Sequence, residues 1–242
     1  MNGKRDRELS ERLKKILLEG GADLVSFADI GEIPEESRKS MPRAVSLAVA
    51  LDPEVLRGIE EGPTWPYFRE YERVIGRIEG LCRLAAAFLK ERGFRAIVLS
   101  STTEQWNRET FSAGFSHKAA ATRAGLGWIG KSDLLVTKRY GAAVRLGTVL
   151  TDGPLAPAEP VDASRCGRCS ACVDRCPAGA IGGSNWEKGV PRELLYDPSR
   201  CAAQARRFCA ALDIPSTICG ICIVACPWTV KYVNRAEGPL ST

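Results

Sequence analysis

The sequence has no long apolar run and almost no histidine. No segment approaches the ~18 apolar residues that a membrane-spanning helix needs, so we expect no such helix. The first residues, Met1 to Glu8, are charged and lack the apolar core of a signal peptide. We therefore expect a cytoplasmic protein in a reducing compartment, where disulfides are not favoured. The chain contains a single histidine, His117.

Cysteine, in contrast, is plentiful, with 10 residues in a chain of 242. Four of them form a C-x2-C-x2-C-x3-C-P run, and three more form a shorter C-x2-C-x3-C-P run. The first run holds Cys166, Cys169, Cys172 and Cys176, and the second holds Cys219, Cys222 and Cys226. Thiolates at this spacing bind 4Fe-4S clusters, with the fourth cysteine of a run serving the neighbouring cluster. Two runs therefore predict two clusters in one small domain.

The second run lacks one cysteine, because Ser216 stands three residues before Cys219. A remote thiolate must complete this cluster, and only Cys201 and Cys209 lie between the runs. Both fall in a helix predicted over 197–212, whose first residues, Asp and Pro, match the N-cap and N1 pattern. Eight residues of helix rise roughly 12 Å, so we do not expect both thiols on one cluster iron.

We predict two sets of four metal ligands, with crossed ligation between the runs. The first set is Cys166, Cys169, Cys172 and Cys226, and the second set is Cys176, Cys201, Cys219 and Cys222. Cys209 is the reserve ligand, and Cys82, on an apolar helical face, is expected in the core. Zinc also takes paired C-x2-C units. It explains neither the additional cysteines nor the trailing prolines, so clusters are the preferred interpretation.

The formal net charge of +5 could suggest a nucleic-acid partner. Eight ligating thiolates would contribute about −8, however, and two oxidised cubane cores about +4, which leaves the loaded protein near neutrality. The charge is therefore weak evidence for nucleic-acid binding.

Helices and strands alternate before the cysteine runs. Helices are expected over 7–19, 67–88 and 117–124, and strands over 22–30, 44–51, 94–99, 134–137 and 142–150. This pattern predicts an α+β or α/β layer domain over 1–157. The segment 152–164 is rich in proline, alanine and glycine, and this composition predicts a linker. It leads into a ferredoxin-like domain with two clusters over 158–242.

A glycine motif before the cysteines matches the letters of a dinucleotide fingerprint. That fingerprint needs a strand before it and a helix after it, whereas here a helix-forming segment precedes the glycines and strands follow. One open interpretation is a glycine C-cap and tight turn. The other is a close approach of the backbone to a large flat ligand. The candidate cofactor-binding residues are then Gly125, Leu126, Gly127, Trp128, Ile129, Gly130 and Lys131.

These motifs together resemble the epoxyqueuosine reductase family, over most of 41–228. The residues that carry the resemblance are Arg123 to Lys131, Leu134-Leu135, Tyr140-Gly141, Leu146-Gly147, Leu150-Thr151-Asp152, both cysteine runs and Cys226-Pro227-Trp228. The resemblance implies a cobalamin in a nitroreductase-like N-terminal domain, two 4Fe-4S clusters that reduce it, and a relationship to reductive dehalogenases. It also supports Cys201, in the segment Tyr196 to Cys201, as the remote ligand.

The resemblance further implies partners and a substrate class. These are an electron donor protein of the ferredoxin or flavodoxin type and a small-molecule or modified-nucleoside substrate, with tRNA as a weakly supported partner. The chain departs from the family in two places. Phe111 occupies the position of the family's catalytic aspartate, and Glu109 is the nearest carboxylate. The sequence also ends soon after Trp228, so a short member without the C-terminal helical-repeat extension is expected.

The candidate catalytic residues are consequently His117 and Glu109. His117 lies just before the glycine motif, where it could donate a proton or bind the cofactor, although a lone histidine at a helix start is commonly a hydrogen-bonded or surface residue. We predict an iron-sulfur oxidoreductase that passes electrons through two clusters to a cobalamin. The alternatives are a ferredoxin-like electron-transfer module that docks a protein partner, and a flavin-dependent reductase on the same core.

Overall fold

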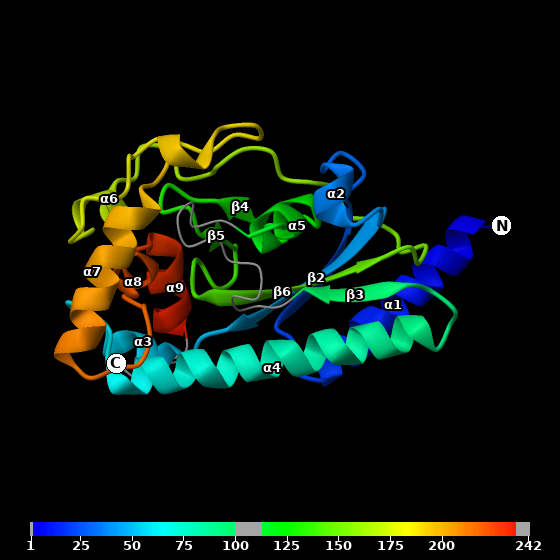
Figure 1. Ribbon diagram of the computed structural model, residues 1–242, viewed down its shortest axis with the longest axis horizontal. Coiled ribbons are helices and arrows are strands. Elements are labelled where there is room, and N and C mark those ends of the chain that lie inside the picture. Colours follow the sequence, from blue (N-terminus) through cyan, green and yellow to red (C-terminus); the bar gives the residue numbers. More distant parts are fainter. Residues whose placement is uncertain (1, 100–112, 236–242) are drawn as a thin grey trace. The chain divides into compact units, whose positions relative to one another are not determined.

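The computed structural model describes residues 2–99 and 113–235, drawn as a coloured ribbon in Figure 1. They form two compact units, each assembled from segments that are far apart in sequence. The sheet unit consists of the described residues of Met1–Val49, Val74–Leu126 and Arg145–Val161. The cysteine unit consists of those of Ala50–Arg73, Gly127–Val144 and Asp162–Thr242. The domain division after residue 157 stays a prediction.

A four-stranded sheet in the order β1-β2-β6-β3 forms the centre of the sheet unit. Its strands are β1 (Leu24–Asp29), β2 (Arg43–Ala50), β3 (Ala96–Leu99) and β6 (Val144–Thr151). β1 is antiparallel to β2, and β3 is antiparallel to β6. The mixed α+β class predicted from the sequence is confirmed, and these pairings supply the strand directions that the helix and strand alternation left open.

Helices cover this sheet because alternate strand residues face opposite sides. The helices are α1 (Asn2–Glu19), α2 (Glu35–Arg38), α5 (His117–Arg123) and the part of α4 (Trp65–Lys90) that starts at Val74. A Cβ atom on Gly147 of β6 would lie 2.7 Å from Cys82 Sγ of α4, so this glycine admits the helix. Cys82 is 1% exposed, which confirms its core assignment.

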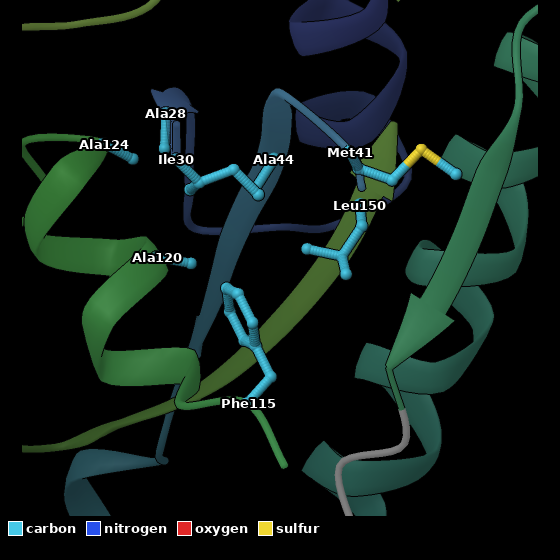
Figure 2. Close-up of a cluster of buried hydrophobic side chains, with 8 residues drawn as sticks. All are labelled: Ala28, Ile30, Met41, Ala44, Phe115, Ala120, Ala124 and Leu150. Atoms are coloured by element: carbon cyan, nitrogen blue, oxygen red, sulfur yellow. The ribbon is translucent and has the colours of Figure 1, made fainter. Parts of the chain in front are cut away.

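The other face of the sheet packs against α5. Ala44 of β2 and Leu150 of β6 meet Ala120 of α5 and its C-cap residue Ala124 in one buried cluster. Figure 2 shows this cluster, to which Ala28, Ile30, Met41 and Phe115 also belong. Small alanines on α5 allow the helix to lie close to the strands, so the start of α5 has a defined position over the sheet.

The cysteine unit contains one short hairpin and several helices. The hairpin pairs β4 (Trp128–Ile129) with β5 (Leu135–Val136). The helices are α3 (Pro53–Arg57), α6 (Ala171–Asp174), the 3-10 helix η1 (Arg192–Leu194), α7 (Pro198–Ala211), α8 (Ile221–Val224) and α9 (Pro227–Arg235). Helix α8 packs against both α6 and α9, and α3 packs against α9.

The helix predicted over 197–212 is confirmed as α7. The Asp197 side chain caps it by accepting hydrogen bonds from the backbone N–H groups of Ser199 and Arg200. The strand predicted over 134–137 contracts to β5, because the chain turns back from Thr137 to a bridge with Gly141. Helix α9 was not predicted. In residues 2–99 and 113–235, no helix is long and apolar enough to cross a membrane.

Candidate iron-sulfur site

The first predicted ligand set gathers around the N-terminal side of α6. Cys166 and Cys169 precede this short helix and Cys172 lies within it, while Cys226 directly precedes α9. Burial, together with the neighbouring thiols of Cys166, Cys226 and Cys169, raises the pKa of Cys172 to about 11. The four thiols are therefore close enough for the charge on one to oppose ionisation of another. Cys169 is exposed, whereas the other three are half-buried.

The second predicted set is assembled from three separate segments. Cys176 follows α6, Cys201 lies on α7, and Cys219 and Cys222 flank the start of α8. Burial raises the pKa of Cys222, and nearby Cys219 and Cys201 act in the same direction. Burial likewise raises the pKa of Cys219, with Cys201, Cys176 and the reserve ligand Cys209 among its neighbours. These four thiols thus form a second group of mutual neighbours.

The reserve ligand, Cys209, is held in the core instead. It is 1% exposed, and its Sγ donates a hydrogen bond to the carbonyl oxygen of Ile218 at 3.4 Å. A cluster ligand must be a thiolate, whereas this bond uses the thiol proton. Burial raises the pKa of Cys201, and a hydrogen bond from the Tyr196 side chain opposes that shift by favouring the thiolate. The Tyr196 hydrogen bond is compatible with Cys201 as the remote ligand, and the choice of Cys201 over Cys209 stays a prediction.

Backbone donors lie beside several of these sulfurs. The N–H of Ala180 donates to Cys176 Sγ at 3.4 Å. Burial raises the pKa of Cys226, against the opposing effect of backbone hydrogen bonds from Thr229 and Trp228. Donors of this kind stabilise the charged form of an acceptor, so they suit thiolate ligands. The two donors beside Cys226 lie in the first turn of α9, which starts directly after that cysteine.

Helix α9 has a fixed position in the cysteine unit. Thr229 is fully buried, and its Oγ1 accepts a hydrogen bond from the N–H of Ala142 at 3.0 Å. A side chain on Gly141 would clash with the backbone of Thr229. Glycine at position 141 therefore lets the segment of Gly141 and Ala142 approach α9 closely and hold Thr229 in place.

No three His, Cys, Asp or Glu side chains converge on a point that could hold a metal ion in the part of the chain that the structure describes. A 4Fe-4S cluster makes a different demand, because its four cysteines bind separate irons at the corners of a cubane. Two groups of four neighbouring thiols are the arrangement that this chemistry requires.

The first glycine of the motif ends helix α5. Gly125 has a φ of +68°, and its N–H donates to the carbonyl of Thr122 at 3.1 Å. The N–H of Leu126 donates to the carbonyl of Ala121 at 3.0 Å. A Cβ atom at Gly125 would lie 2.6 Å from the carbonyl oxygen of Glu159. Gly125 thus has the geometry of a helix C-cap glycine, in agreement with the turn interpretation.

The other two glycines belong to the β4–β5 hairpin. A side chain on Gly127 would clash with the Val136 backbone, and a Cβ atom on Gly130 would lie 2.8 Å from Val136 Cγ2. Trp128, Ile129 and Lys131 are all buried, at 1%, 9% and 8% exposure, and Leu126 is half-buried. At each of the three glycines an added Cβ atom would meet the chain's own atoms, so close backbone packing alone accounts for glycine at these positions. Cofactor binding by Gly125 to Lys131 stays a prediction.

His117 is the first residue of α5, after the N-cap Ser116. Its ring is half-buried, and its Nδ1 lies 2.8 Å from Oγ1 of the fully buried Thr148 on β6. This hydrogen bond orients the imidazole, and a catalytic role for His117 stays a prediction. Glu109 and Phe111 lie outside the described residues.

Sequence reasoning missed the aromatic side chains around the thiols. The Tyr196 hydroxyl donates a hydrogen bond to the Cys201 side chain. The rings of Trp128 and Trp228 meet edge to face, with centroids 5.3 Å apart. The signal for Tyr196 was its place just before the α7 N-cap. Trp128 and Trp228 each stood in a motif already singled out, but nothing in the sequence paired them.

A cavity of about 490 Å³ also lies in the cysteine unit. Side chains of α3, α9 and the loop after α3 line it, together with Arg175 and Val224. None of the predicted site residues lines this cavity, so it does not locate the predicted cofactor.

Comparison with known sequences agrees with the thiol geometry. Residues 165–229 match the family described as the 4Fe-4S double cluster binding domain. The epoxyqueuosine reductase of Synechococcus sp. (strain CC9605) is 31% identical over 208 residues, which are 81% of this chain and 58% of that protein. The epoxyqueuosine reductase of Pseudomonas aeruginosa is 34% identical over 171 residues, which are 66% of this chain and 41% of that protein. The resemblance inferred from the sequence is confirmed, although the chain spans only about half the length of these relatives.

Solved structures show the same fold. A catabolic reductive dehalogenase in complex with 3-bromo-4-hydroxybenzoic acid superposes with a TM-score of 0.71 at 21% identity, covering 96% of this chain and 34% of the dehalogenase. An epoxyqueuosine reductase with an epoxyqueuosine-modified tRNA stem loop superposes with a TM-score of 0.64 at 20% identity, covering 92% of this chain and 66% of the reductase.

Proposed function

We propose that this chain is an iron-sulfur oxidoreductase similar to the epoxyqueuosine reductases, in which two 4Fe-4S clusters deliver electrons to a cobalamin. The observation that carries the proposal is the sorting of ten cysteines. Eight form two groups of four neighbouring thiols, whereas Cys82 and Cys209 are buried with 1% exposure each. The match of 165–229 to the double cluster domain supports the same conclusion.

In this proposal the first cluster is held by Cys166, Cys169, Cys172 and Cys226, and the second by Cys176, Cys201, Cys219 and Cys222. When bound, such clusters carry single electrons at potentials that burial and hydrogen bonds can tune. The Cys172 thiol also adds to the raised pKa of Cys222. This proximity across the two sets supports electron passage between adjacent clusters.

The proposed acceptor is a cobalamin in the sheet unit. Its support is the fold shared with a reductive dehalogenase for which B12-dependent dehalogenation has been described. Because the glycines of the motif face the chain's own atoms, the proposal does not depend on their forming a cradle. His117, oriented by Thr148, is the proposed proton donor within the described residues. Glu109 is the second proposed donor and lies outside them.

The proposed electron donor is a protein of the ferredoxin or flavodoxin type. The exposed Cys169 supports this, because it brings the edge of the first cluster within reach of a docked protein. The proposed substrate is a small molecule or a modified nucleoside, by analogy with the epoxyqueuosine-modified tRNA stem loop in the related structure.

Anaerobic spectroscopy tests this function. Protein loaded with iron and sulfide should contain about eight irons per chain, and added cobalamin should give a corrinoid absorption that stays with the protein on gel filtration. Loaded protein that fails to retain cobalamin would contradict the proposed acceptor and favour an electron-transfer module for a protein partner. Released flavin after denaturation would instead favour the flavin-dependent reductase.

A further inference from the structure

Trp128 has a buried hydrogen-bond donor without an acceptor in the part of the chain that the structure describes. Its side chain is 1% exposed, and its indole Nε1 has no hydrogen-bond partner. Buried N–H groups almost always donate to something, because leaving one unpaired is unfavourable. The backbone at Trp128 is also held in place, since β4 pairs Trp128 with Val136 of β5. The indole nitrogen therefore requires an acceptor that the described residues do not supply.

The surroundings of Trp128 place it beside the first ligand set. Its ring meets that of Trp228, two residues after Cys226, with centroids 5.3 Å apart and an interplanar angle of 75°. The guanidinium carbon of Arg165, the residue before Cys166, lies 5.7 Å from the centroid of the Trp128 ring. The residues that flank two ligands of one set thus contact the same indole.

The hairpin backbone lies against the same ligands. A Cβ atom on Gly130 would lie 3.6 Å from Cys166 Sγ. Gly130 follows Trp128 by two residues, and its N–H donates to the carbonyl of Leu134 at 2.8 Å across the hairpin turn. The hairpin that carries Trp128 therefore approaches the sulfur of Cys166 at Gly130.

We propose that Trp128 donates its indole N–H to a sulfur of the cluster held by Cys166, Cys169, Cys172 and Cys226, and so raises the reduction potential of that cluster. The inference rests on the proposed cluster ligation. A loaded cluster offers sulfide and thiolate sulfurs as acceptors, which is what the unpaired donor requires. Hydrogen bonds to cluster sulfurs tune the potential, and they favour the reduced state because it is the more negative one. The proposed role of Trp128 is to tune the potential of the cluster, and Trp128 does not contact the substrate.

The test is Trp128→Phe, which keeps an aromatic ring in the hairpin and removes the N–H. We expect the iron content to stay at about eight per chain, and the midpoint potential of one cluster to fall in an EPR-monitored redox titration while the other stays unchanged. Trp65→Phe is the matched control, because the Trp65 Nε1 already donates to the carbonyl oxygen of Leu212 at 3.0 Å. It should leave both potentials unchanged. Two unchanged potentials in an iron-replete Trp128→Phe protein would overturn the proposal.

A second measurement uses the wild-type sequence, so it tests the proposed hydrogen bond from Trp128 even if Trp128→Phe loses iron. Protein made with tryptophan labelled with ¹⁵N at the indole nitrogen should show a ¹⁵N coupling in the ENDOR spectrum of a reduced cluster, and Trp228→Phe should retain it. Absence of any such coupling would refute the bond. An iron content near zero would instead show that the proposed cluster function fails, and loss of cobalamin binding alone would leave the Trp128 result intact.

Discussion

The two ligand sets of the cysteine unit are built in different ways. Three ligands of the first set come from one short stretch around α6, and exposed Cys169 opens this set to solvent. The second set draws Cys176, Cys201 and the pair Cys219 and Cys222 from three segments, and it forms only when α7 and α8 are in place. Local spacing therefore suffices for most of the first set, whereas the second depends on tertiary packing.

The largest effect, on iron content, is expected when the remote ligand is removed. Cys201→Ser should lower the iron content from about eight to about four per chain, because the second cubane loses one of its four thiolates. Cys209→Ser makes the same chemical change on the same helix, yet it should leave iron at about eight. Iron analysis with EPR of the reduced protein would measure both. Iron lost from Cys209→Ser and retained by Cys201→Ser would move the remote ligand to Cys209.

The next effect concerns the hairpin beside the first set. Gly127→Ala should lower the free energy of unfolding by about 3 kcal/mol, because the new Cβ would overlap the Val136 backbone and the hairpin must open. It should also release iron from the first cluster before the second. Gly80→Ala is the control: nothing lies within 4 Å of its Cβ position in α4, so alanine should stabilise the helix by about 0.5–1 kcal/mol. Urea denaturation followed by circular dichroism would measure both.

A smaller effect, on the pH dependence of stability, is expected from Cys82, which belongs to neither ligand set. Burial raises the pKa of Cys82 from 9.0 to about 12, so its neutral thiol stabilises the fold fully below pH 9. That contribution is lost as the pH rises from 9 towards 12, because the unfolded chain ionises first. The loss is about 1.4 kcal/mol per pH unit. Stability should therefore fall less steeply above pH 9 in Cys82→Ala than in the wild type, with iron content unchanged in neutral buffer. Parallel pH profiles would contradict the assignment, as would lost iron.

The smallest effect is expected on the reduction potentials of the two clusters, which two different substitutions should shift separately. Tyr196→Phe removes the hydroxyl that donates to Cys201, so it should lower the potential of the second cluster only. Trp128→Phe should lower that of the first cluster only. Redox titration of each variant, and of the double variant, would show two independent shifts. If both substitutions moved the same cluster, the division of the eight cysteines would have to be redrawn.

Much of the fold and the candidate site was predictable where the cause was local. Asp197 and Pro198 marked the start of α7, and Gly125 marked the end of α5. The strand predicted over 134–137 shortened because Thr137 turns back to Gly141. A propensity pattern does not report such a turn. Helix α9 was missed for a related reason: its position depends on Thr229, which is buried against a segment far away in the chain.

The sequence by itself determined a double-cluster domain and predicted eight thiolates for it, because cluster ligation depends on short spacings that a few residues set. The absence of a cysteine at Ser216 likewise demanded a remote ligand. Only the tertiary structure showed that the Cys209 thiol meets a core carbonyl and that the Tyr196 hydroxyl meets Cys201, which supports Cys201 as the proposed remote ligand. It also brought Trp128 and Trp228 together at the first set. These contacts join residues far apart in the chain, so no local pattern encodes them.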